Sequence, residues 1–103
     1  MTAKGYWIGN STIHDMDGIA QYREANRAAM NRHGAKFIIM HGQQQIVEGN
    51  SILPTWTVVE FPSYAAAVAC YKDPEYVEAV KIRHRSADGV MAIVEGYDGT
   101  QDF

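Results

Sequence analysis

The sequence predicts an α+β protein of the ferredoxin-like class, βαββαβ, with a four-stranded antiparallel sheet. Apolar runs and amphipathic segments follow one another as strand, helix, strand, strand, helix, strand. Right-handed crossovers then place both helices on one face of the sheet. The 103 residues suffice for one domain, 1–103, and residues 98–103 have the composition of a flexible tail.

The amino-terminal part of the chain alternates a strand with a helix. Residues 5–12 (GYWIGNST) are rich in aromatic and β-branched side chains, which favours a strand. In the next segment, Asp15 or Asp17 can cap a helix and Gly34 can end it in a left-handed conformation. The apolar stripe of this helix holds Ile19, Tyr22, Asn26, Ala29, Met30 and His33, while Arg23, Glu24 and Arg27 face elsewhere.

The middle of the chain is predicted to be a β-hairpin. Residues 36–47 (KFIIMHGQQQIV) begin apolar and become polar, and residues 52–61 return after a turn at 48–51. Pro54 falls near the start of the returning strand, where its missing N–H is tolerated.

Two helical segments and a strand complete the fold. Ser63 is a natural N-cap for residues 64–72. The Asp-Pro pair at 73–74 restarts a helix, since aspartate caps well and proline suits the first helical position. Gly89 then releases the chain into a last strand over residues 90–97.

The sheet face away from the helices would be bare in a monomer. The second strand has apolar residues on both faces, with Phe37 and Ile39 on one and Ile38 and Met40 on the other. Exposed apolar surface of that extent indicates association. We therefore predict a homodimer in which two sheets pack face to face as a dimeric α+β barrel.

The composition argues against several classes of partner. A formal net charge of −3 does not suit a nucleic-acid surface, which needs an excess of clustered cations. Lys81, Arg83 and Arg85 are the one basic cluster, and we expect it to face solvent near a helix end. The apolar runs are too short for a signal peptide or a membrane span, so a cytoplasmic protein without a membrane partner is expected.

Motifs for metals and cofactors are missing from the sequence. The single Cys70 has no partner thiol and is expected in the core. The four histidines lack HxH or HExxH spacing, and the segment 15–18 is too short for a calcium loop. There is no GxGxxG, P-loop or GxSxG sequence. We therefore expect neither a metal nor a cofactor.

Short blocks along nearly the whole chain carry a family resemblance. They are KGYWI at 4–8, EFPS at 60–63, CYKDPEY at 70–76, KIR at 81–83, AD at 87–88 and IVEG at 93–96. In these blocks the chain resembles a widespread bacterial family known as domain of unknown function thirteen-thirty. The resemblance implies a ferredoxin-like dimeric α+β barrel without an established activity. The chain departs from similar proteins at Met40-His41-Gly42, where many have Arg-Gly-Gly, and near Trp56, where an arginine or histidine is common.

Glu60 is an ionisable residue near the end of an apolar strand, within the stretch VVEFPSY at 58–64. A hairpin that turns about Asn50 and Ser51 would place His41 directly across from Glu60. A carboxylate beside an imidazole is typical of a proton-transferring pair. The structural alternatives are an interfacial ion pair, or an acceptor for N–H groups at the start of the next helix.

Arg83 is the candidate for binding an anion. Its planar guanidinium could hold a carboxylate or a phosphate in a forked arrangement. The structural alternative is a salt bridge on the helix surface to Glu78 or Asp88, or a dimer contact.

Four aromatic residues are further candidates for ligand binding. Tyr71 and Tyr76 flank a predicted helix corner, where they could line a pocket mouth or pack with a bonded hydroxyl. Trp7 and Trp56 could form the walls around an aromatic ligand or anchor an interface.

These observations leave three functions open. The first is a small-molecule site in the interior of the dimeric barrel. The second is a cofactor-independent enzyme of oxygenase, isomerase or decarboxylase type acting on a small acidic or aromatic substrate, by analogy of fold. In that enzyme Glu60 or His41 would be the base and Arg83 would hold the anion. The third is a non-catalytic dimeric structural or binding module, with Glu60 as a structural acceptor.

Overall fold

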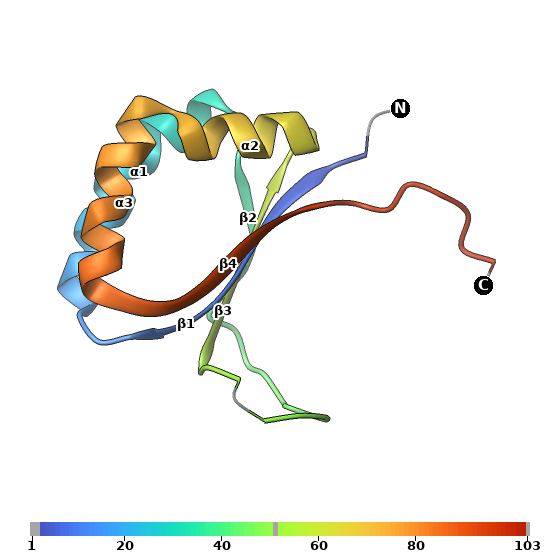
Figure 1. Ribbon diagram of the computed structural model, residues 1–103, viewed down its shortest axis with the longest axis horizontal. Coiled ribbons are helices and arrows are strands. Elements are labelled where there is room, and N and C mark those ends of the chain that lie inside the picture. Colours follow the sequence, from blue (N-terminus) through green and yellow to red (C-terminus); the bar gives the residue numbers. More distant parts are fainter. Residues whose placement is uncertain (1–2, 51, 103) are drawn as a thin grey trace.

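A computed structural model describes residues 3–50 and 52–102 as a sheet with one layer of helices (Figure 1). The elements are β1 (Gly5–Ile13), α1 (Met16–Arg32), β2 (Lys36–Met40), β3 (Thr55–Phe61), α2 (Tyr64–Lys72), α3 (Pro74–Ser86) and β4 (Ala87–Glu95). The strands pair in the antiparallel order β2-β3-β1-β4. The predicted βαββαβ class is confirmed, with the second helix divided into α2 and α3.

Local sequence signals set the helix boundaries. The side chains of Asp15 and Ser63 each accept the backbone N–H three residues on, at 3.0 Å. Asp73 caps α3 by accepting from the N–H of Glu75 at 2.9 Å. Gly34, just beyond α1, has a left-handed φ of 76°. Each of these caps was predicted, because a cap depends on residues within a few positions of it.

Asp73 also joins the end of α1 to the corner between α2 and α3. Its Oδ2 lies 2.8 Å from Nε2 of His33 and 3.1 Å from Nη2 of Arg32. The hydrogen bond from His33, with those from the Glu75 N–H and Arg32, lowers the pKa of Asp73 to about 2. This ionic corner fixes α1 alongside α3, and the two helices pack against each other over the sheet.

The predicted hairpin is wrong in length and register. The strands predicted at 36–47 and 52–61 are shorter, since β2 ends at Met40 and β3 begins at Thr55. Lys36, not His41, pairs with Glu60, and a β-bulge interrupts the pairing further along. His41 takes a left-handed φ of 55°, which turns the chain out of the sheet.

The described parts of the connection, residues 41–50 and 52–54, therefore project beyond the sheet instead of forming strands (Figure 1). Ser51 of the predicted turn lies outside the described residues, as do residues 1–2 and 103 at the chain ends. Residues 96–102 continue past β4 without a helix or strand.

The last strand starts earlier than predicted. β4 begins at Ala87, and Gly89 lies inside it, opposite Ser11 of β1. A Cβ on Gly89 would lie 2.3 Å from the carbonyl oxygen of Asn10. This glycine therefore allows two strands to approach closely, whereas the sequence predicted that it separates the preceding helix from the strand.

The core lies between the sheet and the helices. Trp7 is its centre: the indole N–H donates to the carbonyl of Ala67 at 2.9 Å, and the ring contacts Phe61, Tyr71 and Tyr76. Cys70 is buried, as predicted, and burial raises the pKa of its thiol to about 12.

The opposite face of the sheet has no helix over it in the described chain (Figure 1). By strand alternation and register it presents Tyr6, Ile8, Ile39, Val58 and Val94, which we call the open sheet face. Ile39 and Val94 are among the exposed large hydrophobic residues. No helix within residues 3–50 and 52–102 has the length and apolar character needed to cross a bilayer.

Candidate functional site

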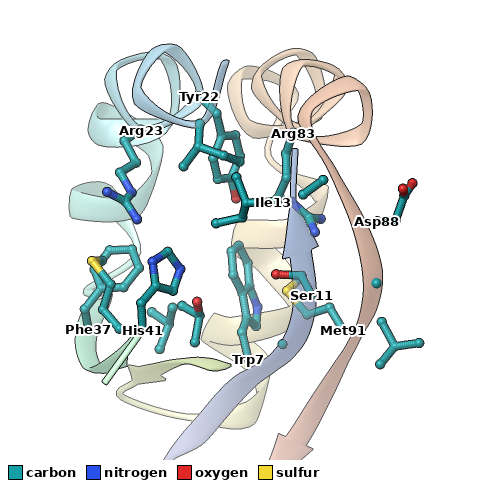
Figure 2. A pocket seen from close by; sticks show the side chains of 18 of the residues that line it. Trp7, Ser11, Ile13, Tyr22, Arg23, Phe37, His41, Arg83, Asp88 and Met91 are labelled. Atoms are coloured by element: carbon teal, nitrogen blue, oxygen red, sulfur yellow. The ribbon is translucent and has the colours of Figure 1, made fainter. Parts of the chain in front are cut away.

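A cavity of about 90 Å³ lies between the sheet and the helices (Figure 2). One water molecule needs about 10–15 Å³, so the cavity has room for several waters or one compact ligand. Alternate residues of β1 form its floor, among them Trp7, Gly9 and Ser11. The remaining walls come from α1, α3, β2, β3 and the first residues of β4.

Gly9 contributes space to this cavity. A Cβ built on Gly9 would meet its nearest neighbours, the carbonyl oxygens of Thr57 and Val90, at 3.8 Å, which is ordinary contact. Its φ lies outside the left-handed region, so the backbone accepts any residue suited to a strand. The missing side chain at position 9 is therefore open volume on the cavity floor.

Arg83 is the clearest polar feature of the cavity wall. Its Nε is buried and makes no hydrogen bond within the described chain. Its guanidinium carbon lies 5.7 Å from the centre of the Tyr22 ring, a cation–π contact. The alternative of a salt bridge to Glu78 or Asp88 is not seen among the described residues: Glu78 pairs with Lys81, and Asp88 lies near His14.

Tyr22 contacts Arg83 and is itself hydrogen-bonded to Tyr76. The hydroxyls of Tyr22 on α1 and Tyr76 on α3 are 2.5 Å apart, and Tyr76 is fully buried. Burial raises the pKa of the Tyr76 hydroxyl well above its usual value, so it stays protonated. This hydrogen bond fixes the Tyr22 ring on which the Arg83 guanidinium rests.

Arg23 and His41 line another part of the wall, across the cavity from Arg83 (Figure 2). No carboxylate of the residues that the structure describes forms a salt bridge with Arg23. Burial lowers the pKa of His41, and the nearby positive charge of Arg23 lowers it further. His41 is therefore a neutral imidazole at neutral pH, beside a fixed cation.

The predicted site residues divide between the two faces of the sheet. His41, Arg83 and Trp7 meet at the cavity. Tyr71 and Tyr76 pack behind it, against the Trp7 ring.

Trp56 and Glu60 lie away from the cavity. The Trp56 indole donates to Gln44, outside the cavity lining. Glu60 accepts a hydrogen bond of 3.2 Å from the Tyr6 hydroxyl on the open sheet face, and partial burial and this carboxylate raise the pKa of Tyr6.

The predicted pair of His41 and Glu60 is not formed. The hairpin register moves Glu60 opposite Lys36, so the carboxylate and the imidazole lie at different ends of the hairpin and on different sides of the sheet. The geometry gives no support to a catalytic role for Glu60. The cavity also lies within a single chain, between sheet and helices, whereas the site had been predicted between two sheets.

Sequence reasoning missed Tyr22 and Arg23 as site residues. Tyr22 was assigned to the helix stripe that packs in the core, and Arg23 was predicted to face away from it. A signal was present, because Arg23 follows Ile19 by four positions and such residues share a helix face. Within the described part of the chain, no group of three His, Cys, Asp or Glu side chains could hold a metal ion.

The comparisons with known proteins agree on the fold. The profile of a domain of unknown function, DUF1330, matches residues 4–97. The RPA0582 protein from Rhodopseudomonas palustris, of unknown function, is 19% identical with a TM-score of 0.72, over 96% of this chain and 86% of that one. Its methylated form gives a TM-score of 0.74 at 19% identity, over 95% and 84%.

A third solved structure is more distant in sequence. SnoaB, a cofactor-independent oxygenase from Streptomyces nogalater, gives a TM-score of 0.62 at 8% identity, over 98% of this chain and 100% of that one. At these identities the likeness shows the shared fold alone. A search of curated proteins found no match.

Proposed function

Because the chain belongs to the DUF1330 family, a family without an assigned function, we propose its function from its own cavity. The protein binds a small molecule that carries an anionic group on a compact apolar body. One observation carries this proposal: the buried Nε of Arg83 lacks a hydrogen-bond partner in the described structure at the wall of a largely apolar cavity. A buried charged donor is costly unless an acceptor reaches it, and a carboxylate matches the guanidinium fork.

The charge of the lining supports the same ligand class. Arg23 and Arg83 both line the cavity, and neither has a salt bridge among the residues described. The one carboxylate in the lining, Asp88, is 84% exposed and lies near His14. The interior field is therefore positive, and it favours an anion in a site that excludes much of the water.

Benzoate and benzamide form a matched pair of probes for this site. They have the same ring and shape, but only benzoate has an anionic group. We expect benzoate to bind at least about 10-fold more tightly than benzamide, as a charge-assisted hydrogen bond predicts. Isothermal titration calorimetry at low salt measures both dissociation constants. Equal affinities, or no benzoate binding, would contradict the proposal.

Gly9→Val tests whether the ligand occupies the cavity. The valine side chain would fill the floor without clashing with the backbone, because the neighbours of the added Cβ are at contact distance. We expect benzoate binding to be lost while the protein stays folded. Ala92→Val is the control, since Ala92 pairs with Ile8 and faces the opposite side of the sheet. Unchanged binding by Gly9→Val would place the ligand elsewhere.

We also infer that the protein is a homodimer formed through the open sheet face. An antiparallel sheet exposed on one side is normally polar there, whereas this face carries Ile8, Ile39 and Val58 in adjacent strands. Glu60 and Lys36 lie side by side on it. A twofold axis that passes between these two residues would bring each charge to the opposite charge of the partner, so a second copy suits the face. The interfacial ion pair considered from the sequence joined Glu60 to His41; in this proposal Lys36 takes the place of His41.

Ile39→Glu should separate the dimer into monomers. Analytical ultracentrifugation at micromolar concentration should give twice the 11.5 kDa chain mass for the unmodified protein and the single chain mass for the variant. The reason is that the introduced carboxylate would be buried against apolar side chains of the partner's sheet. Val77→Glu is the control, because Val77 on α3 is 42% exposed and Ile39 is 46% exposed. A monomeric unmodified protein would contradict the inference.

A further inference from the structure

His41 occupies a position in the cavity that ligand binding alone does not require. Its left-handed backbone, with φ of 55°, directs the chain out of β2 at the cavity edge. A hydrogen bond of 2.9 Å from its N–H to the carbonyl of Trp56 fixes this turn against β3. The imidazole is thus held in the wall, beside Arg23 and across from Arg83 (Figure 2).

We propose that the cavity catalyses proton transfer at carbon, with His41 as the base and an enolisable α-keto acid as the substrate. The inference rests on the proposed binding of an anion. The carboxylate of such an acid suits Arg83. The substrate then extends toward the opposite wall, where His41 and Arg23 lie together. This arrangement places a base and a cation next to one carbonyl group.

The proton transfer balances without another reactant. The C–H bond next to the carbonyl breaks, the proton moves to the free ring nitrogen of His41, and the electron pair forms an enolate. The Arg23 guanidinium stabilises the negative charge that develops on the enolate oxygen. The proton of His41 then returns, either to that oxygen, which gives the enol, or to carbon, which restores the keto acid. The net reaction is a keto–enol isomerisation.

The electrostatics of the wall suit a base that works at neutral pH. Burial and Arg23 lower the pKa of His41, so the imidazole is unprotonated and able to accept a proton. The charged groups that line the same cavity are Arg23 from α1, Arg83 from α3 and Asp88 from β4. The arginines remain charged throughout the working range, so they favour the enolate at every pH used.

Phenylpyruvate is the probe for this reaction, and His41→Asn is the variant. Asparagine tolerates the left-handed backbone of position 41 but is not a base. Deuterium uptake at the methylene carbon, followed by NMR in deuterium oxide, reports proton removal above the buffer rate. We expect His41→Asn to lower the protein-dependent rate at least about 100-fold. His84→Asn, which changes an exposed histidine on α3, should keep the rate.

The pH profile and benzoate binding separate a base from a structural residue. The rate per unit enzyme should rise with pH and reach half its maximum below the ordinary histidine pKa of about 6.5. His41→Asn should bind benzoate within about 3-fold of the unmodified protein, since arginine supplies the main contact. Unchanged deuterium uptake in His41→Asn with benzoate still bound would overturn this inference alone. If the unmodified protein did not bind benzoate, the binding proposal would be overturned as well.

Discussion

Arg83→Met should weaken benzoate binding by about 10- to 100-fold, the loss expected for a charge-assisted hydrogen bond worth about 1.5–3 kcal/mol. Methionine keeps much of the apolar volume but removes the buried Nε that has no acceptor in the described structure. The free energy of unfolding should change by less than about 1 kcal/mol, because two effects oppose each other. Loss of the cation–π contact destabilises the variant, whereas removal of a buried charge stabilises it. Calorimetry and urea denaturation measure the two quantities.

Arg85→Met is the matched control for this prediction. Arg85 lies two positions along the same helix, in its last turn, and its side chain is exposed. The substitution removes the same charge from the protein, so it corrects for the long-range electrostatic effect. If both variants weakened benzoate binding equally, net charge would explain the loss and Arg83 would have no direct contact with the ligand.

Trp7→Ala should lower the free energy of unfolding by about 3–5 kcal/mol, which is a large share of the stability of a small domain. The indole is 2% exposed, contacts the rings of Phe61, Tyr71 and Tyr76, and donates its N–H to the carbonyl of Ala67. Its removal leaves a void at the junction of sheet and helices and an acceptor without its donor. Urea denaturation at one fixed protein concentration measures the loss.

Trp56→Ala removes the same side chain from a less buried position. Trp56 is only partly buried, and its indole donates to Gln44 in the projecting connection. We expect a smaller loss than for Trp7→Ala, because the Trp56 side chain is only partly buried within the chain. Similar losses in the two variants would mean that Trp7 is not the centre of the core.

The cavity could be predicted from the sequence only in part. Arg83, His41 and Trp7 were candidates because each residue type suits a chemical role, and all three line the cavity. The sequence could not say that they meet, because they lie on α3, at the end of β2 and on β1. Arg23 was predicted to face away from the apolar stripe of its helix, although a cavity beneath the edge of α1 gives its long side chain a different environment.

The strand pairing of Glu60 could not be predicted from the hairpin turn alone. Its pairing was predicted from a hairpin that turns about Asn50 and Ser51, but β3 is also paired with β1, where Tyr6 lies opposite Glu60. Two neighbouring strands and a bulge in β2 therefore fix its register jointly. The connection over residues 41–54 then adapts to that register. A local turn rule describes only one of these constraints.

The sequence alone determined the order of the elements and the helix boundaries. Caps such as Asp15, Ser63 and Asp73 satisfy backbone groups a few residues away, so their effect is already present in the local sequence. The tertiary structure decided the register of β2 on β3, the side of the sheet that holds the cavity, and the meeting of Arg23, His41 and Arg83 there. These features depend on contacts between distant segments, whose geometry is set only when the helices pack on the sheet.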